Sequence, residues 1–160
     1  MYNKIYNIEY KEYRKEELAE IDKNLIEMSE KSARRAYAPY SHFKVGAAAL
    51  LENGEIITGS NQENAASPSG ICAERTTLFY ANAKYPDAAV KTLAITAIDS
   101  NDNIVERVIT PCGACRQVIL EVENRYNSPC RLLLSSKDTV LEFSSIKDLL
   151  PFSFGKDDLK

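Results

Sequence analysis

Apolar residues recur every three to four positions between about residues 16 and 36, which is the period of one face of an α-helix. Because Pro39 cannot continue a helix, this pattern predicts an amphipathic helix that ends before it. The residues of the apolar face are Leu18, Ile21, Leu25, Met28, Ala33 and Ala36.

Two apolar, partly β-branched runs follow within FKVGAAALLENGEIITGSN, residues 43–61. They flank Asn53 and Gly54, a pair that strongly favours the tight turn of a β-hairpin. We therefore expect two antiparallel strands joined at this turn. The next segment, NQENAASPSG, is rich in polar residues, proline and glycine, and we expect it to be a loop.

Helices and strands alternate in the second half of the chain. We expect helices over about residues 72–83 and 112–123, and a short final helix over 145–151. The segment VKTLAITAID, residues 90–99, has the apolar character of a strand buried on both faces. Two more strands are expected over residues 131–136 and 139–144. This order predicts an α/β fold, in which a mixed sheet with some parallel pairing carries helices on both faces.

The N-terminus gives a weaker pattern. Ile8 and Tyr10 alternate with polar residues between Ile5 and Tyr13, which suggests a short edge strand. A chain of 160 residues fits one compact domain. We therefore divide it into an N-terminal extension, residues 1–15, and a single domain, residues 16–160.

Charge and composition narrow the class of protein. The formal net charge of -3 argues against a protein that binds nucleic acid through phosphate contacts, since such proteins usually have a basic face. No apolar run approaches the roughly 20 residues that span a bilayer, and the N-terminus lacks a signal-peptide core, so we expect a cytoplasmic protein. In a reducing cytosol, metal binding or catalysis explains four cysteines better than two disulfides do.

Three of the cysteines lie at predicted helix starts. Cys112 and Cys115 form a C-x-x-C motif after Pro111, and Cys72 opens the other helix. If the two helices lie side by side on the sheet, the three thiolates converge and form an open zinc site with a fourth position for water. Helix N-termini also stabilise thiolates. A redox pair or two packed cysteines would give the same C-x-x-C spacing.

The charged residues beside these cysteines are of the kinds that a zinc site needs. Glu74 is placed to accept the proton of a zinc-activated water, although a glutamate in the first turn is also favoured by the helix dipole. Three thiolates bound to one Zn²⁺ ion give the metal site a net negative charge. We hypothesise that Arg75 and Arg116 donate hydrogen bonds to the sulfurs and so drain that charge. Both arginines would otherwise belong to a solvated face or a surface ion pair.

The sequence resembles the cytidine deaminases of the small homotetrameric zinc type, which have three cysteine ligands. The matching segments run in order from about Tyr37 to Leu159: YAPYSHFKVGAAALLENGEIITGSN, QENA, GICAER, PCGACRQ and LLPFSFGKDDL. The resemblance implies a three-layer α/β/α sandwich around a five-stranded mixed sheet. It also implies one Zn²⁺ per subunit, held by Cys72, Cys112 and Cys115, with Glu74 as the proton shuttle.

The resemblance further implies how a nucleoside substrate is bound. Asn61 and Glu63 would hold the ribose hydroxyls, and Phe43 would pack against the pyrimidine. The backbone N–H of Ala73 would bind the base carbonyl, and the backbone carbonyl of Thr110 would receive the leaving amine. A carboxylate at Glu63 would also repel a 5′-phosphate, which favours nucleosides over nucleotides.

The implied reaction is hydrolytic deamination of cytidine and deoxycytidine to uridine and deoxyuridine with release of ammonia, a step of pyrimidine salvage. The implied assembly is a homotetramer in which Phe154 reaches the site of a neighbouring subunit. Ser67 and Ser69 depart from the family pattern, since many relatives have a large aromatic and an aliphatic residue there. Substrate breadth is therefore left open by the sequence.

Three other functions fit part of the pattern. Deamination of another cytosine nucleoside, such as blasticidin S, needs the same zinc ligands. Deamination of RNA or DNA is disfavoured, because such enzymes more often have His as the first ligand and use a basic surface. A zinc-stabilised binding module would make Glu74 dispensable. The single histidine, His42, and the fourth cysteine, Cys130, are expected to be structural.

Overall fold

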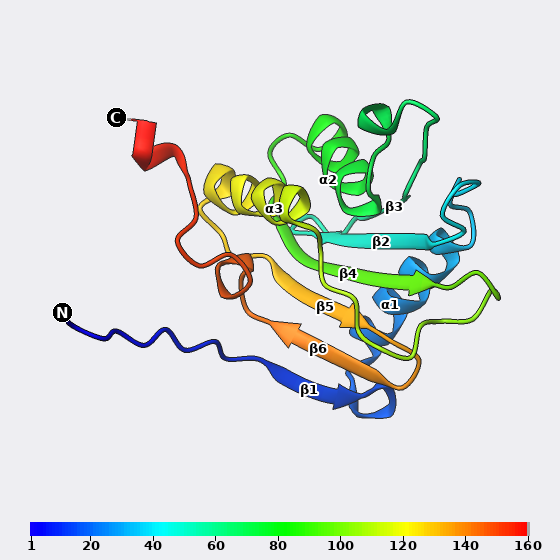
Figure 1. Ribbon diagram of the computed structural model, residues 1–160, viewed down its shortest axis with the longest axis horizontal. Coiled ribbons are helices and arrows are strands. Elements are labelled where there is room, and N and C mark those ends of the chain that lie inside the picture. Colours follow the sequence, from blue (N-terminus) through cyan, green and yellow to red (C-terminus); the bar gives the residue numbers. More distant parts are fainter. Residues whose placement is uncertain (160) are drawn as a thin grey trace.

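The computed structural model describes residues 1–159 and has a six-stranded mixed sheet at its centre (Figure 1). Across the sheet the strand order is β1-β6-β5-β4-β2-β3. The strands are β1 (Lys11–Arg14), β2 (Lys44–Leu51), β3 (Ile56–Ser60), β4 (Val90–Ile98), β5 (Arg131–Ser135) and β6 (Thr139–Phe143).

Strand pairing follows the predicted alternation. β2 and β3 form the antiparallel hairpin expected at Asn53 and Gly54, and Gly54 has the positive φ of 85° that this turn requires. β4 and β5 are parallel, whereas β2 pairs antiparallel to β4 and β6 pairs antiparallel to β5. The mixed sheet is therefore confirmed.

Helices cover both faces of the sheet, as predicted. α1 (Glu20–Ala33) lies on one face, and α2 (Ala73–Lys84) and α3 (Gly113–Tyr126) lie together on the other (Figure 1). α1 is shorter than the predicted helix over residues 16–36, because residues 15–17 form a separate 3₁₀ turn. The expected final helix is a single 3₁₀ turn, Ile146–Asp148, and two further 3₁₀ turns cover Ser67–Ser69 and Lys156–Leu159.

The sheet has six strands and not the five that the family resemblance implied. The additional strand is β1, which pairs antiparallel with the otherwise free edge of β6. It lies within residues 1–15, the segment that precedes the part of the chain resembling the family. The division of the chain into an extension and one domain remains a prediction.

Alternating side chains of the central strands supply two hydrophobic cores. Ala48 of β2 and Leu133 of β5 pack with Leu25 of α1 on one face of the sheet. Their neighbours Ala47 and Leu132 belong to the core under α2 and α3. The second core supports the two helices whose N-termini carry the predicted zinc ligands.

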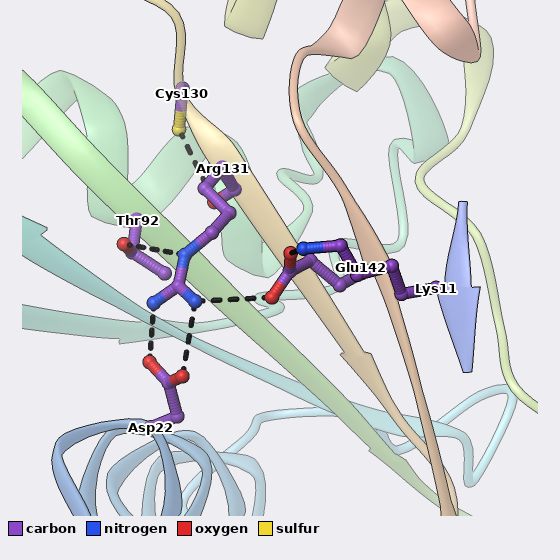
Figure 2. A network of polar contacts seen from close by, with 6 residues as sticks. All are labelled: Lys11, Asp22, Thr92, Cys130, Arg131 and Glu142. Carbon is purple, nitrogen blue, oxygen red and sulfur yellow. Dashed lines mark hydrogen bonds and ion pairs between the residues drawn. The ribbon is translucent and has the colours of Figure 1, made fainter. Parts of the chain in front are cut away.

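A network of ion pairs joins α1 to the outer strands (Figure 2). Arg131 of β5 forms a bidentate pair with Asp22 of α1, and its Nη1 lies 3.1 Å from a carboxylate oxygen of Glu142 in β6. Glu142 also lies 3.0 Å from the Nζ of Lys11 in β1. The guanidinium Nε of Arg131 donates to the hydroxyl of Thr92 in β4 at 3.4 Å. This network fixes α1 and β1 relative to the sheet.

Candidate metal centre and substrate cavity

The two helices on the shared face of the sheet both begin at a cysteine. Cys72 is the N-cap of α2 and Cys112 is the N-cap of α3, each with extended backbone angles. Cys115 follows in the first turn of α3 and is buried. Both helix starts therefore present sulfur atoms beside unpaired backbone N–H groups, which favour negative charge.

The three sulfurs form a cluster of the right size for a zinc ion. All three lie within 4.8 Å of one another, and the Sγ atoms of Cys72 and Cys112 are 3.9 Å apart. Sulfurs held about 2.3 Å from a tetrahedral Zn²⁺ are roughly 3.8 Å apart, so the spacing fits this metal. The predicted convergence of the two helix starts is confirmed. Cys130 is not part of this cluster. It directly precedes β5 and is buried in the hydrophobic core, as expected.

Arg75 is placed beside the sulfurs. Its Nη2 donates to the Sγ of Cys72 at 3.6 Å, and its buried Nε has no hydrogen-bond partner within the described chain. Hydrogen bonding from Cys115 and then from Arg75 lowers the pKa of the Cys72 thiol to about 5. The partner thiol, Cys115, has a raised pKa because it donates to Cys72 and is buried. The surroundings of Cys72 therefore favour the thiolate, which is the form of cysteine that binds metal.

Arg116 makes different contacts from those predicted. Its guanidinium donates to the carbonyl oxygens of Pro111 at 2.8 Å and Leu149 at 2.7 Å, and to the hydroxyl of Thr110 at 3.0 Å. All the hydrogen bonds recorded for its side chain therefore end on oxygen and not on sulfur. Arg75 and Arg116 have similar positions at the two helix starts. The segments beside the two helices differ, however, so the two side chains reach different acceptors.

Glu74 is a buried carboxyl group in the first turn of α2, with 4% of its surface exposed. Burial raises the pKa of this carboxyl group, and the nearby charge of Cys72 adds to the effect. A carboxyl group with a raised pKa both accepts and returns protons near neutral pH. Glu74 lines the same cavity as Cys72 and Cys112, and its role as a proton shuttle stays a prediction.

A cavity of about 710 Å³ opens beside the cluster. Its volume is suited to a small organic ligand such as a nucleoside. Most of the predicted substrate residues line it, together with Glu74 and two of the three predicted metal ligands. The predicted residues on its wall are Phe43, Asn61, Glu63, Cys72, Glu74, Arg75, Thr110 and Cys112.

Two predicted substrate residues are placed differently. Ala73 is buried as the first residue of α2, so its backbone N–H is among those without an acceptor inside the helix. Phe154 is exposed on the C-terminal segment and is not among the residues that line the cavity of its own chain. His42 is exposed and is not among the residues that line the cavity, and its expected structural role stays a prediction.

The segment around Asn61 and Glu63 is held against the start of β2. The side-chain amide of Asn61 accepts from the backbone N–H of Val45 at 2.7 Å and donates to the carbonyl of Phe43 at 3.0 Å. The carboxylate of Glu63 accepts from the hydroxyl of Ser41 at 2.5 Å, which with the backbone of Tyr40 lowers the pKa of Glu63. The sequence pattern gave no sign of these contacts, since Ser41 lies in a loop far from Glu63 along the chain.

Comparison with known proteins identifies the group to which this arrangement belongs. Residues 19–126 match the family model for the cytidine and deoxycytidylate deaminase zinc-binding region. The chain is a member of that deaminase family. Cytidine deaminase from Sporosarcina psychrophila is 40% identical over 84% of this chain and 92% of that protein. Cytidine deaminase from Mycobacterium tuberculosis is 35% identical over 89% of this chain and 96% of that protein.

Solved structures of deaminases share the fold. The crystal structure of cytidine deaminase from Burkholderia pseudomallei superposes with a TM-score of 0.69 at 36% identity, covering 82% of this chain and 97% of that chain. The structure of the Mycobacterium tuberculosis enzyme gives a TM-score of 0.62 at 30% identity, covering 86% and 98%. The three-cysteine cluster of this deaminase fits one Zn²⁺ per chain. Among residues 1–159, no helix is long and apolar enough to cross a membrane.

Proposed function

We propose that the chain is a zinc-dependent deaminase that hydrolyses cytidine and deoxycytidine to the uracil nucleosides and ammonia, a reaction of pyrimidine salvage. One observation carries this proposal. Three sulfurs with zinc spacing and one buried carboxyl group, Glu74, stand together at the wall of a cavity large enough for a nucleoside.

Cys72, Cys112 and Cys115 would hold the metal and leave one position open. Bound there, Zn²⁺ would supply an activated water near neutral pH. Glu74 would take one proton from that water and deliver it to the ring nitrogen N3 as the water oxygen adds to C4. It would then move the proton of the new C4 hydroxyl to the exocyclic nitrogen, so that the C4–N bond breaks, ammonia leaves and the C4 carbonyl of the uracil nucleoside remains. Burial raises the pKa of the Glu74 carboxyl group toward neutral pH, which suits a group that must both accept and release a proton.

The cavity wall would orient the nucleoside. Phe43 packs against the pyrimidine, while Asn61 and Glu63 bind the ribose hydroxyls. The free N–H of Ala73 binds the base carbonyl, and the carbonyl of Thr110 receives the leaving amine. These assignments are supported by the position of four of the residues on one cavity wall and by the position of Ala73 at the helix start.

The two arginines have separate roles in this proposal. Arg75 donates to the Cys72 sulfur and offsets the negative charge of the metal site. Arg116 instead positions the segment that precedes Cys112, since it is bonded to both Thr110 and Pro111. It thereby sets the place of the Thr110 carbonyl.

The proposal includes a homotetramer in the cytoplasm. Phe154 supports assembly, because it is exposed on a segment outside its own cavity and is free to enter the site of a neighbouring subunit. The four free cysteines support a reducing compartment, where thiolates are kept available for metal. No nucleic acid or membrane partner is proposed.

Two rival functions make different predictions. A blasticidin S deaminase would have the same metal ligands but would turn over that antibiotic in preference to cytidine. A zinc-stabilised binding module would hold zinc but turn over neither compound. The depth at which Glu74 is buried favours an enzyme, because a buried carboxyl group is costly to fold around and is retained where it acts.

An absorbance assay with ammonia detection tests the proposal. Zinc-loaded protein is given cytidine, deoxycytidine, cytidine 5′-phosphate and blasticidin S, and chelator-treated protein serves as the control. The proposal predicts rapid loss of cytosine absorbance with the first two nucleosides and little with the phosphate. Turnover of blasticidin S alone, or none with zinc bound, would reject it.

A further inference from the structure

Ser41 is at the centre of a set of hydrogen bonds on the sugar side of the cavity. Its hydroxyl donates to Oε1 of Glu63 at 2.5 Å, and its backbone N–H donates to Oε2 at 3.3 Å. The N–H of Tyr40 donates to the same Oε2 at 2.8 Å. Ser41, Tyr40 and Glu63 all line the cavity.

These contacts leave Glu63 with one direction in which to accept a ligand. An ionised carboxylate has about four acceptor sites, two on each oxygen. Two N–H groups occupy Oε2, and the Ser41 hydroxyl occupies one site on Oε1. The remaining site is therefore on Oε1, and its direction is set by the hydroxyl of Ser41.

The same hydroxyl ties the sugar side of the cavity to the base side. It accepts a hydrogen bond from the backbone N–H of Phe43 at 3.0 Å while donating to Glu63. Phe43 is the aromatic residue placed against the pyrimidine. This oxygen atom thus links Glu63 to the backbone of Phe43, 20 residues away in the chain, while the side-chain amide of Asn61 holds the carbonyl of Phe43 independently.

The backbone between these residues is held in a conformation that costs free energy. His42, between Ser41 and Phe43, has a φ of 56°, in the left-handed region that a side chain disfavours. Such a conformation persists where surrounding contacts hold it, and the contacts on either side are those of Ser41. Strained residues of this kind are frequent at ligand-binding sites.

We propose that Ser41 is a positioning residue for the sugar, which orients the Glu63 carboxylate toward a ribose hydroxyl and holds it in register with Phe43. This inference rests on the proposed binding of ribose by Glu63. Ser41 is not a predicted metal ligand, and its recorded hydrogen bonds join it to Glu63 and Phe43. Its loss should weaken substrate binding without slowing the chemical step.

The test compares Ser41→Ala, Ser41→Thr, Glu63→Gln and the double variant Ser41→Ala/Glu63→Gln. Each is assayed with cytidine and with 2′,3′-dideoxycytidine, which has no hydroxyl at either sugar position. Ser100→Ala, an exposed serine after β4, is the matched control. Circular dichroism and zinc content are measured for every variant.

For cytidine, Ser41→Ala should raise KM about tenfold and leave kcat within about twofold, as expected for one hydrogen bond to a charged group. With the dideoxy nucleoside, the same substitution should change KM little. Ser41→Thr keeps the hydroxyl and should restore the KM for cytidine. The double variant should be no worse than Glu63→Gln, because Ser41 acts through Glu63.

Equal losses with both nucleosides would overturn the inference, as would an unchanged KM in Ser41→Ala or additive losses in the double variant. If Ser41→Ala does not fold, a folded Ser41→Thr protein with a raised KM would also overturn it. A raised KM in Glu63→Gln with none in Ser41→Ala would reject the role of Ser41 alone. An unchanged KM in Glu63→Gln would reject the sugar-binding role of Glu63 as well.

Discussion

Arg75 comes three residues after Cys72 and Arg116 comes directly after Cys115, yet the two arginines make different contacts. Arg75 donates to a sulfur, and Arg116 donates to three oxygens of the segments beside α3. A helix start determines which backbone groups are free, but the neighbouring loops determine which acceptor a long side chain reaches. The two arginines should therefore respond differently to substitution.

Arg75→Ala should weaken zinc binding about 10- to 100-fold, because a hydrogen bond to the Cys72 thiolate is lost and its charge is left uncompensated. Competition with a chelator measures this affinity. Arg116→Ala is the matched control, and it should keep zinc while raising KM through movement of Thr110. Equal zinc affinities in wild type and Arg75→Ala would contradict the role given to Arg75.

Single residues were predictable from the sequence where spacing carries the chemistry. The C-x-x-C motif and a third cysteine with a nearby glutamate sufficed to place the metal cluster. Ser41 and the side-chain contacts of Asn61 were not predictable, because they depend on how residues 37–45 fold against residues 61–63. Such contacts join loops, and loops have no periodicity from which to infer them.

The order of the strands determines the face of the sheet on which the two helices that carry the site lie. α2 precedes β4 in the chain, and α3 connects β4 to β5, its parallel neighbour. Because crossover connections are right-handed, both helices lie on the same face of the sheet. The alternation of helical and strand patterns along the second half of the chain was enough to predict that the two helices lie side by side. Alternation also suggested an edge strand between Ile5 and Tyr13, and the structure has this strand slightly later in the chain, as β1 (Lys11–Arg14). The ion-pair network was not predictable, because its members come from five separate elements.

Arg131→Met should destabilise the fold by about 2 to 4 kcal/mol, because the buried carboxylate of Asp22 would lose its partner and that of Glu142 would keep only the exposed Lys11. Denaturant unfolding at neutral pH measures the loss. Lys11→Ala removes an exposed partner of Glu142 from the same network and should leave the midpoint almost unchanged. Similar midpoints for wild type and Arg131→Met would show that the network contributes little.

At the scale of the whole molecule, exposed aromatic residues suggest that the single chain is not the working unit. Phe79 and Tyr80 on α2, with Phe152 and Phe154 near the C-terminus, are each at least half exposed. Large exposed aromatic side chains of this kind are common at surfaces that contact another protein chain. The homotetramer was implied by family resemblance and remains a proposal, since periodicity along one chain says nothing about contacts between chains.

Phe154→Ala should raise KM for cytidine at least about tenfold, because the aromatic ring would be lost from a neighbouring subunit's cavity. Steady-state kinetics measures the effect, and analytical ultracentrifugation establishes the mass of each variant. Phe152→Ala is the matched control, since its ring lies 6.2 Å from that of Tyr6 in the same chain. A monomeric wild type with full activity would contradict the shared site.

Glu74 is expected to move protons at a zinc site whose folding does not depend on the Glu74 side chain, and the variant Glu74→Ala tests this role. Zinc per chain and turnover of cytidine are measured on the same preparation. We expect one zinc per chain, an unchanged circular dichroism spectrum and a loss of turnover of at least about a thousandfold. Retained turnover with zinc bound would contradict it.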